Sequence, residues 1–247
     1  MKRTFDVSMA VLGLVLAAPL LAIISVLIKL DSQGPVIFRQ VRVGRGFRPF
    51  AIWKFRTMAV DAPGTGLPLT VGQDSRITRI GRILRKCKLD ELPQLWNVLI
   101  GDMSFVGPRP EVPRYVECLR AEFSEVLTVR PGITDLASLR YIDEASILAY
   151  SSSPEEEYQL KVLPEKLRLA KFYIRHMSLR LDLAIIIQTL LHIARIPAVV
   201  FTHPELKAAV DPPLSAPWTS LSSFIVRWLK PIVVVLDVAL IILANYF

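Results

Sequence analysis

The pattern of hydrophobic and polar positions predicts a membrane helix near the N-terminus. No residue from Val7 to Ile28 is charged, a run of 22 residues. A straight helix of this length rises about 33 Å, which is enough to cross the hydrocarbon core of a bilayer. Lys2 and Arg3 precede the run as they would in a signal peptide, but the run is long and lacks a clear small-x-small cleavage site.

Pro19 lies near the middle of this run. A proline inside a helix removes a backbone hydrogen bond and clashes with the preceding turn, so it bends the helix. Lysines and arginines flank the run on both sides, and the positive-inside tendency places both groups in the cytoplasm. A helix that bends at Pro19 and returns to the same membrane face satisfies both groups. A crossing helix is the alternative, because membrane helices tolerate proline.

Partial alternation of apolar and polar residues predicts a short β-hairpin after the apolar run. Its strands are expected at residues 36–43 and 50–56, and Gly44 and Gly46 mark the turn between them. Residues 62–68 are rich in proline and glycine and are expected to form a loop.

Helical spacing of apolar residues returns farther along the chain. One helix is expected over residues 76–86, and a short one carries Leu92, Leu95, Trp96 and Leu99, with Asp90 at its N-cap and its end near Gly101. The other expected elements are a helix over 111–125, a β-like segment after a turn at 129–134, a helix start at Glu155 and a helical region over 163–194 interrupted near Ser178. The apolar face of this last region fits either packing on the domain or lying at the bilayer interface.

Composition fits one water-facing domain that is attached to a bilayer by few segments. Hydrophobic residues make up 52% of the chain, and the mean hydropathy of +0.43 lies above that of soluble domains and below that of polytopic carriers. Two cysteines, Cys87 and Cys118, form no disulfide framework, which fits a reducing, cytosol-facing domain. The three histidines are far apart and have no zinc-site spacing.

Positive charge is concentrated in one part of the sequence. The net charge is +8, and the stretch from Arg39 to Lys88 holds twelve lysines and arginines against two acidic residues. Such a basic block beside an apolar segment predicts affinity for anionic membrane lipids or phosphorylated ligands. Nucleic acid is the competing partner, but no helix-turn-helix, zinc-finger or aromatic RNA-binding signature accompanies the charge, so we expect no nucleic-acid binding.

Residues 88–111 bring together the groups with the clearest chemistry. Asp90 and Glu91 are adjacent carboxylates, a short apolar helix follows, and Arg109 stands between two prolines. Carboxylates can hold a metal ion, and a guanidinium can bind phosphate oxygens bidentately. Together with the apolar N-terminal segment, these groups indicate phosphoryl chemistry at a membrane surface.

Several motifs in this order resemble those of the bacterial monotopic phosphoglycosyl transferases. The matching stretches, spread over residues 1 to roughly 195, are Lys54–Met58, Leu84-Arg85, Leu89–Leu95, Asn97–Leu99, Gly101–Ser104, Val106–Pro110, Arg130–Thr134, and Ser178-Leu179 with Asp182. The resemblance implies an enzyme of the bacterial inner membrane whose catalytic domain faces the cytoplasm. Such an enzyme transfers sugar-1-phosphate from a UDP-sugar to polyprenyl (undecaprenyl) phosphate and releases UMP. This is the first membrane step of exopolysaccharide, capsule, O-antigen or glycoprotein glycan assembly.

The resemblance also implies roles for the two adjacent carboxylates. Asp90 matches the nucleophile that attacks the UDP-sugar, expels UMP and holds the sugar phosphate covalently. Its place at a helix start is expected to favour the ionised form. Glu91 matches the partner acid that, with Asp90, binds the required Mg²⁺.

Basic residues and one proline carry the rest of the resemblance. Arg109 matches the family's substrate-binding arginine, and further basic positions near the phosphates match Lys54, Arg56 and Arg85. Pro19 matches the helix-breaking proline and so favours the re-entrant arrangement, although the usual Ser-Pro pair is Ala18-Pro19 here.

The expected fold class is therefore a mixed α/β membrane-associated domain with a re-entrant helix broken at Pro19, a short β-hairpin, and surrounding and interfacial helices. The expected divisions are a membrane helix at 1–30, the catalytic domain at 31–195, a linker at 196–220 and a partial transmembrane helix at 221–247, which fits a truncation or a fusion junction. The tail from Arg227 resembles the first transmembrane helix of membrane-bound nucleotide-sugar epimerase/dehydratase proteins.

Two positions depart from the family pattern. Asp135 stands where the family commonly has glycine, and Ala170-Lys171 replaces an acidic residue before Phe172. These departures bear on sugar recognition more than on phosphoryl chemistry. A membrane-tethered domain that holds nucleotide sugar or anionic lipid without turnover is the rival hypothesis, and UMP release separates the two.

Overall fold

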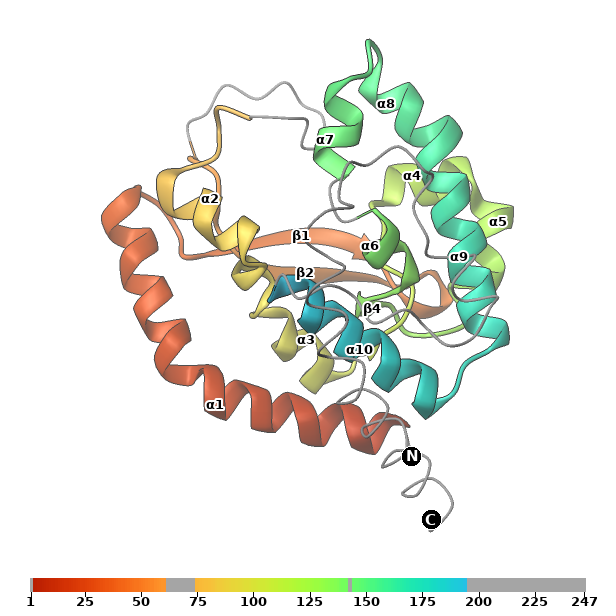
Figure 1. Cartoon of the computed structure of the whole chain (residues 1–247), viewed down its shortest axis with the longest axis horizontal. Coiled ribbons are helices and arrows are strands. Elements are labelled where there is room, and N and C mark those ends of the chain that lie inside the picture. The colour runs from red at the N-terminus through yellow and green to blue at the C-terminus, as the bar shows by residue number, and fades with distance from the viewer. Residues whose placement is uncertain (1, 61–73, 142–143, 195–247) are drawn as a thin grey trace, which may run out of the picture. The chain divides into compact units, whose positions relative to one another are not determined.

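The computed structural model describes residues 2–60, 74–141 and 144–194, and all contacts discussed below lie within residues 2–186, the first of its two compact units. Helices and two small sheets make up this unit (Figure 1). In chain order the elements are α1 (Lys2–Asp31), β1 (Ile37–Val43), η1 (Arg45–Phe47), β2 (Pro49–Phe55), α2 (Arg79–Lys86), η2 (Leu89–Glu91), α3 (Gln94–Ile100), β3 (Ser104–Val106), α4 (Pro113–Cys118), α5 (Arg120–Val126), β4 (Gly132–Thr134), α6 (Leu136–Arg140), α7 (Glu144–Ala149), α8 (Pro154–Glu157), the π-helical turn η3 (Tyr158–Val162), α9 (Leu163–Arg175) and α10 (Leu179–Ile193). The mixed α/β class is confirmed.

The predicted hairpin is confirmed. Strands β1 and β2 pair antiparallel, from Ile37 opposite Phe55 to Val43 opposite Pro49. The connecting turn contains Gly46 with a φ of 66°, a conformation that glycine adopts without steric cost. The hairpin places Lys54 on β2, close to the end of the strand.

A second sheet consists of two short parallel strands. Strand β3 pairs with β4, with Ser104 opposite Gly132 and Val106 opposite Thr134. A Cβ on Gly132 would lie 2.1 Å from the backbone nitrogen of Gly107, so the close approach at this point requires glycine. The β-like segment near residue 132 was predicted, whereas its partner β3 was not.

Helix boundaries differ from the prediction at two places. The helix predicted over 76–86 begins at Arg79. Ile77 pairs with Met58 in an isolated β-bridge, and Thr78 is the N-cap, whose side-chain oxygen accepts from the Gly81 N–H. The single helix predicted over 111–125 is wrong: α4 and α5 are separated at Leu119, whose backbone is not helical. Both helices turn apolar side chains toward one core, so the periodicity continues across the break.

The later helical predictions agree with the structure. The interruption near Ser178 separates α9 from α10, and α8 begins beside the expected start at Glu155. The largest core cluster joins α4, α5, α9 and η3 and includes Tyr115, Val116, Phe123, Tyr158 and Leu163. The predicted loop at 62–68 and all of residues 196–247 lie outside the described residues.

Helix α1 is 30 residues long and is long and apolar enough to cross a membrane. The chain stays helical on both sides of Pro19, and Figure 1 shows that α1 changes direction along its length. A bent helix is therefore observed, and the re-entrant arrangement stays a prediction.

One face of α1 lies against the domain in both halves of the helix, before and after Pro19. Ala10 is buried with Ile52, Val98 and Met103, and farther along Ile24 and Ile28 are buried with Phe55 and Leu84. The opposite face is exposed and apolar, and its large side chains are Met9, Val11, Leu12, Val15, Leu16, Leu20, Ile23, Val26, Leu27 and Leu30. In water this surface would be unfavourable, whereas lipid would cover it.

Polar contacts attach the N-terminal end of α1 to the domain. The Lys2 ammonium group donates to Asp182 Oδ2 at 2.5 Å and to the Tyr173 hydroxyl at 2.9 Å. The Arg3 guanidinium donates to the last carbonyls of α3, and Asp6 accepts from Ser104 Oγ and the Phe105 N–H. These contacts fix the first two turns of α1.

The C-terminal end of α1 is attached to the same domain. Asp31 Oδ2 accepts from the Ile80 N–H at 3.0 Å. The Arg56 guanidinium donates to the Ser32 carbonyl at 2.7 Å and to the Gln33 carbonyl. Both ends of the long helix are thus held by one compact unit.

Candidate active site

The adjacent carboxylates lie on η2, a short turn between α2 and α3. Lys88 precedes the turn in the left-handed conformation, with a φ of 54°, and Pro93 rather than Asp90 is the N-cap of α3. The prediction that Asp90 caps this helix is wrong, because an extra turn separates the carboxylate from the first residue of α3, Gln94. The predicted end at Gly101 is confirmed by its φ of 99°.

Asp90 is buried, and one of its carboxylate oxygens has no hydrogen-bond partner among the described residues. Its residue is 8% exposed, and none of the described residues donates a hydrogen bond to Oδ1. Burial raises the pKa of Asp90, as does the neighbouring charge of Glu91, while Lys54, Arg85 and Lys88 oppose the rise. The sequence had led us to expect a helix start that favours the ionised form, and this expectation is wrong.

Glu91 has the opposite environment. Its Oε1 accepts from Lys54 Nζ at 2.7 Å and from Arg109 Nη2 at 2.5 Å, and its Oε2 lies 3.4 Å from Arg109 Nη1. Burial alone would raise the pKa of Glu91, but Arg109 and Lys54 hold it well below its usual range. Of two adjacent carboxylates, one is therefore paired and ionised and the other is unpaired with a raised pKa.

The two cations on Glu91 come from different parts of the fold. Lys54 lies on β2, and burial lowers its pKa against the charge of Glu91. Arg109 follows β3 and lies between two prolines that limit its backbone freedom. The charge of Glu91 raises the pKa of Arg109, so both partners of this pair are ionised.

Arg85 lies on α2, the helix that precedes the turn η2. Its Nε donates to Thr57 Oγ1 at 2.9 Å, and burial lowers its pKa while the charge of Asp90 opposes that shift. The structure therefore places Arg85 within the electrostatic field of Asp90, as expected for a basic residue near the site.

Arg56 differs from the other predicted basic residues. Among the described residues its guanidinium donates to Ser32 and Gln33, and none of these hydrogen bonds goes to Asp90 or Glu91. Its observed contacts join the end of α1 to β2. The structure brings together Asp90, Glu91, Lys54, Arg85 and Arg109, and it leaves Arg56 in a separate cluster.

Comparison with known proteins places this arrangement in a family. The sequence profile of the bacterial sugar transferase family matches residues 1–195. The chain belongs to this family.

Individual relatives of this sugar transferase are named for different sugars. A protein of Aeromonas hydrophila named UDP-N-acetylgalactosamine-undecaprenyl-phosphate N-acetylgalactosaminephosphotransferase is 38% identical over 192 residues, 76% of this chain and 42% of its own length. A protein of Caulobacter vibrioides named UDP-glucose:undecaprenyl-phosphate glucose-1-phosphate transferase is 47% identical over 142 residues, 56% of this chain and 53% of its own length. A Bacillus subtilis relative, provisionally named as an N-acetylgalactosaminyl 1-phosphate transferase, is 48% identical over 133 residues, 54% of this chain and 70% of its own length. The chain thus spans about half of the Aeromonas and Caulobacter proteins.

Two polar residues of α3 were not singled out from the sequence. Asn97 is fully buried, and its amide accepts from the Trp53 N–H at 3.0 Å and donates to the Ala51 carbonyl at 2.8 Å. It therefore bonds to the backbone of β2 as a neighbouring strand would and joins α3 to the strand that carries Lys54. Gln94 is also fully buried, and no described residue bonds to either end of its amide. The available signal was a polar residue between the apolar positions of a short helix.

The carboxylate pair can be tested against the Mg²⁺ that the family resemblance implies. Mg²⁺ binds through one or two protein carboxylates and takes its other oxygens from substrate phosphates and water. Asp90 Oδ1 is a buried acceptor that no described residue occupies, and Glu91 is its neighbour. Among the described residues, no group of three or more histidine, cysteine or acidic side chains is arranged to hold a metal ion by itself. The Asp90 oxygen could therefore accept a magnesium ion shared with a diphosphate, whereas both oxygens of Glu91 are hydrogen-bonded to Lys54 and Arg109.

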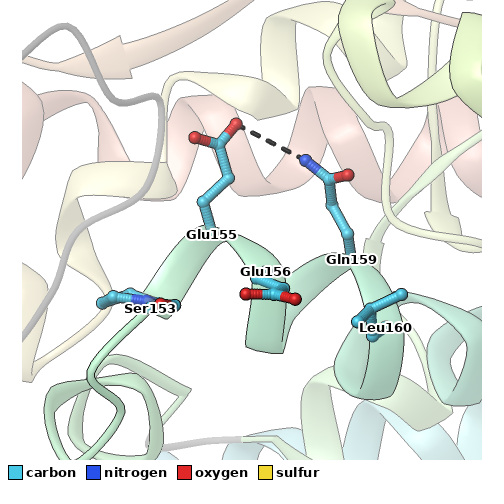
Figure 2. A pocket seen from close by; sticks show the side chains of 6 residues that line it. Ser153, Glu155, Glu156, Gln159 and Leu160 are labelled. Atoms are coloured by element: carbon cyan, nitrogen blue, oxygen red, sulfur yellow. Dashed lines mark hydrogen bonds between the residues drawn. The ribbon is translucent and has the colours of Figure 1, made fainter.

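Two surface hollows are lined by neither Asp90 nor Glu91. The first, shown in Figure 2, is formed by α8, η3 and the residue before them, and in it Glu155 accepts from Gln159 at 3.5 Å. It contains none of the predicted site residues. The second is a small cavity beside Arg109 that is also lined by Pro108, Lys166 and the two departures from the family pattern, Asp135 and Ala170.

Proposed function

We propose that this sugar transferase moves sugar-1-phosphate from a UDP-sugar to undecaprenyl phosphate and releases UMP, with Asp90 as the nucleophile. The observation that carries the proposal is the contrast between the two carboxylates. Asp90 is buried with an unoccupied oxygen, while Glu91 beside it holds two cations of the kind that bind phosphates. The names of the relatives support the substrate class.

The proposed reaction divides one displacement into two. An oxygen of Asp90 attacks the phosphorus that bears the sugar, the bond from that phosphorus to the UMP oxygen breaks, and UMP leaves with the bond electrons. A phosphate oxygen of undecaprenyl phosphate then attacks the same phosphorus, and the Asp90 carboxylate is released. The sugar phosphate is thus attached to the enzyme between the two steps.

Lys54, Arg85 and Arg109 support this chemistry through their charge. Lys54 and Arg109 already bind an anionic oxygen, that of Glu91, and a diphosphate offers them oxygens of the same kind. Arg85 favours the ionised, nucleophilic form of Asp90 against the effect of burial. Asp90 and Glu91 would hold Mg²⁺, which when bound compensates charge on the diphosphate and on the departing UMP.

The attachment of α1 at both ends supports the re-entrant arrangement. A helix that crossed the bilayer would place its ends on opposite faces, about 30 Å apart across the hydrocarbon core. Lys2 and Asp31 instead bond to the same compact unit, and that unit buries Ala10 in the first half of the helix and Ile24 and Ile28 in the second. We therefore propose that α1 enters and leaves on the cytoplasmic face of the bacterial inner membrane, with its exposed apolar face in lipid.

This position would hold Asp90 at the height of the lipid headgroups, where the phosphate of undecaprenyl phosphate can reach it. Anionic lipids would attract the basic block. The product would start a cell-surface glycan, and a relative of Rhizobium leguminosarum named an exopolysaccharide production protein fits that role. The relatives differ in the sugar they are named for, so the sugar is to be found by experiment.

The test is UMP release by the detergent-solubilised full chain mixed with undecaprenyl phosphate and a panel of UDP-sugars. We expect release with at least one sugar and loss of activity of about 10³-fold or more in Asp90→Asn, since the amide is a poor nucleophile. Mass spectrometry of the trapped enzyme should find a sugar phosphate on the peptide that contains Asp90. Full UMP release by Asp90→Asn would reject the nucleophile, and tight UDP-sugar binding without release would favour the binding hypothesis.

A further inference from the structure

Asp135 connects two segments that meet beside the active site. It follows β4 and precedes α6, and it is only 3% exposed. Its Oδ1 accepts from the Ser138 N–H at 2.6 Å, which caps α6. Its Oδ2 accepts from the Arg109 N–H at 3.0 Å. One buried carboxylate thus holds two backbone amides that lie on different segments.

The contact with Arg109 continues the parallel β3–β4 pairing. Backbone bonds join the two segments up to Pro108: the Gly107 N–H donates to the Thr134 carbonyl at 3.2 Å, and the Gly132 N–H donates to the Pro108 carbonyl at 3.1 Å. Pro108 has no N–H, and Pro110 has none either. Arg109 carries the single N–H between these two prolines, and the Asp135 side chain accepts it.

The other end of Arg109 is held by neighbouring groups. Its Nη1 lies 3.4 Å from the Ile133 carbonyl, and its Nη2 donates to Glu91 Oε1 at 2.5 Å. Ile133 and Asp135 belong to the same short stretch of chain. The junction of β4 and α6 therefore contacts both the backbone and the guanidinium of Arg109.

We propose that Asp135 is a positioning residue for Arg109: by accepting its backbone N–H, Asp135 fixes the direction in which the guanidinium faces Glu91 and the diphosphate of the UDP-sugar. This inference rests on the proposed function for the nature of the ligand. The geometric part, that Asp135 restrains the Arg109 backbone, holds independently of any turnover. Arg109 would bind the diphosphate before the reaction as well as during it, so loss of its position should raise KM more than it lowers kcat.

A pair of variants separates this role from helix capping. Asp135→Ala removes both bonds, whereas Ser138→Pro removes the capping N–H in the first turn of α6 and keeps the acceptor of the Arg109 N–H in place. Asp135→Asn keeps one good capping acceptor and serves if Asp135→Ala does not fold. Arg109→Ala and the double variant Asp135→Ala/Arg109→Ala complete a double-mutant cycle.

Two readouts are needed. Hydrogen exchange with residue-level fragmentation reads the Arg109 amide and separates it from the amides of Glu111 and Val112, while Pro108 and Pro110 contribute none. Initial rates of UMP release from UDP-glucose and UDP-N-acetylgalactosamine with undecaprenyl phosphate give KM and kcat. We expect Asp135→Ala to speed exchange at the Arg109 amide by about tenfold or more. It should also raise KM for the UDP-sugar by about tenfold, with a smaller change in kcat. Ser138→Pro should change the exchange rate, KM and kcat by less than about twofold. In the Arg109→Ala background, Asp135→Ala should add no further rise in KM.

An equal effect of Asp135→Ala with and without Arg109 would overturn the inference, as would unchanged exchange at the Arg109 amide. A wild-type chain that releases no UMP from any UDP-sugar would instead reject the proposed function. In that case the exchange measurement still decides whether Asp135 restrains Arg109.

Discussion

Lys2 and Asp182 are 180 positions apart in the chain, yet their charged atoms lie 2.5 Å from each other. The same carboxylate accepts from the Tyr173 hydroxyl at 2.6 Å, so one buried group joins the start of α1 to α9 and α10. An apolar helix with basic residues before it looks, in sequence, like an independent anchor. Here its first basic residue, Lys2, donates hydrogen bonds to side chains of α9 and α10.

We expect Asp182→Asn to lower the free energy of unfolding by about 1–2 kcal/mol, because the variant leaves the Lys2 ammonium group without its counter-ion in a partly buried place. Thermal unfolding in detergent measures the change. The control is Lys161→Ala, which removes a surface pair with Glu157 and should cost less than about 1 kcal/mol. Equal shifts in the two variants would contradict a structural role for the Lys2–Asp182 pair.

The attachment of both ends of α1 predicts which residues a membrane-impermeant thiol reagent can reach. Cys87 and Cys118 are free and exposed, so they are first replaced by serine. Single cysteines at the exposed positions Thr4 and Lys29, close to the two ends of α1, should then be labelled from the cytoplasmic face only, in inside-out vesicles and not in intact spheroplasts. Labelling of one end from each side would show that the helix crosses the bilayer.

Sequence periodicity predicted the elements that surround the site. The hairpin that carries Lys54 and the end of the short helix at Gly101 are as expected, because alternation and helical spacing are local properties. The short strand β3 has only three residues and no such pattern, so its parallel pairing with β4 could not be predicted.

The environments of Asp90 and Glu91 could not be predicted from the same information. Asp90 looked like a helix cap because the turn η2, which separates it from α3, has no sequence signal of its own. The pairing of Glu91 with Lys54 and Arg109 joins positions 37 and 18 residues away, and local pattern contains no such contact. Motif resemblance identified these residues, whereas the fold shows which carboxylate is paired.

Arg109 and Arg56 give a prediction that separates substrate binding from structure. Arg109→Lys keeps a charge but loses the forked geometry on Glu91, so we expect KM for the UDP-sugar to rise by about tenfold or more. Arg56→Lys should lower the temperature of unfolding, since it loses hydrogen bonds to Ser32 and Gln33, and should leave KM of the folded enzyme within about twofold. A KM effect of Arg56→Lys as large as that of Arg109→Lys would return Arg56 to the substrate-binding set.

Asn97 is predicted to be a structural requirement of the site. Asn97→Leu has a similar volume but leaves the Trp53 N–H and the Ala51 carbonyl without their partners, which should lower the free energy of unfolding by about 2–4 kcal/mol. Chemical denaturation followed by tryptophan fluorescence measures the loss. Ile100→Ala, on the exposed end of the same helix, is the control and should change stability little. Unaltered stability in Asn97→Leu would mean that α3 is held on β2 by its apolar contacts alone.

Glu91 serves two roles in the proposed reaction, and Glu91→Gln should affect both. In the free protein the substitution removes the negative charge that pairs with Lys54 and Arg109, so the free energy of unfolding should fall. In the reaction the loss of one anionic oxygen beside Asp90 should raise the Mg²⁺ concentration needed for half-maximal UMP release by about tenfold or more, and chelation of Mg²⁺ should stop release by the wild type.

Glu111→Gln is the control, since Glu111 is a buried acid that accepts from the Tyr158 hydroxyl and makes no bond to Glu91 among the described residues. It should lower stability without moving the Mg²⁺ dependence. If Glu91→Gln left that dependence unchanged while lowering stability as much as Glu111→Gln, Glu91 would act only as the counter-ion of Lys54 and Arg109, and Asp90 would be the one carboxylate of the pair that faces the metal.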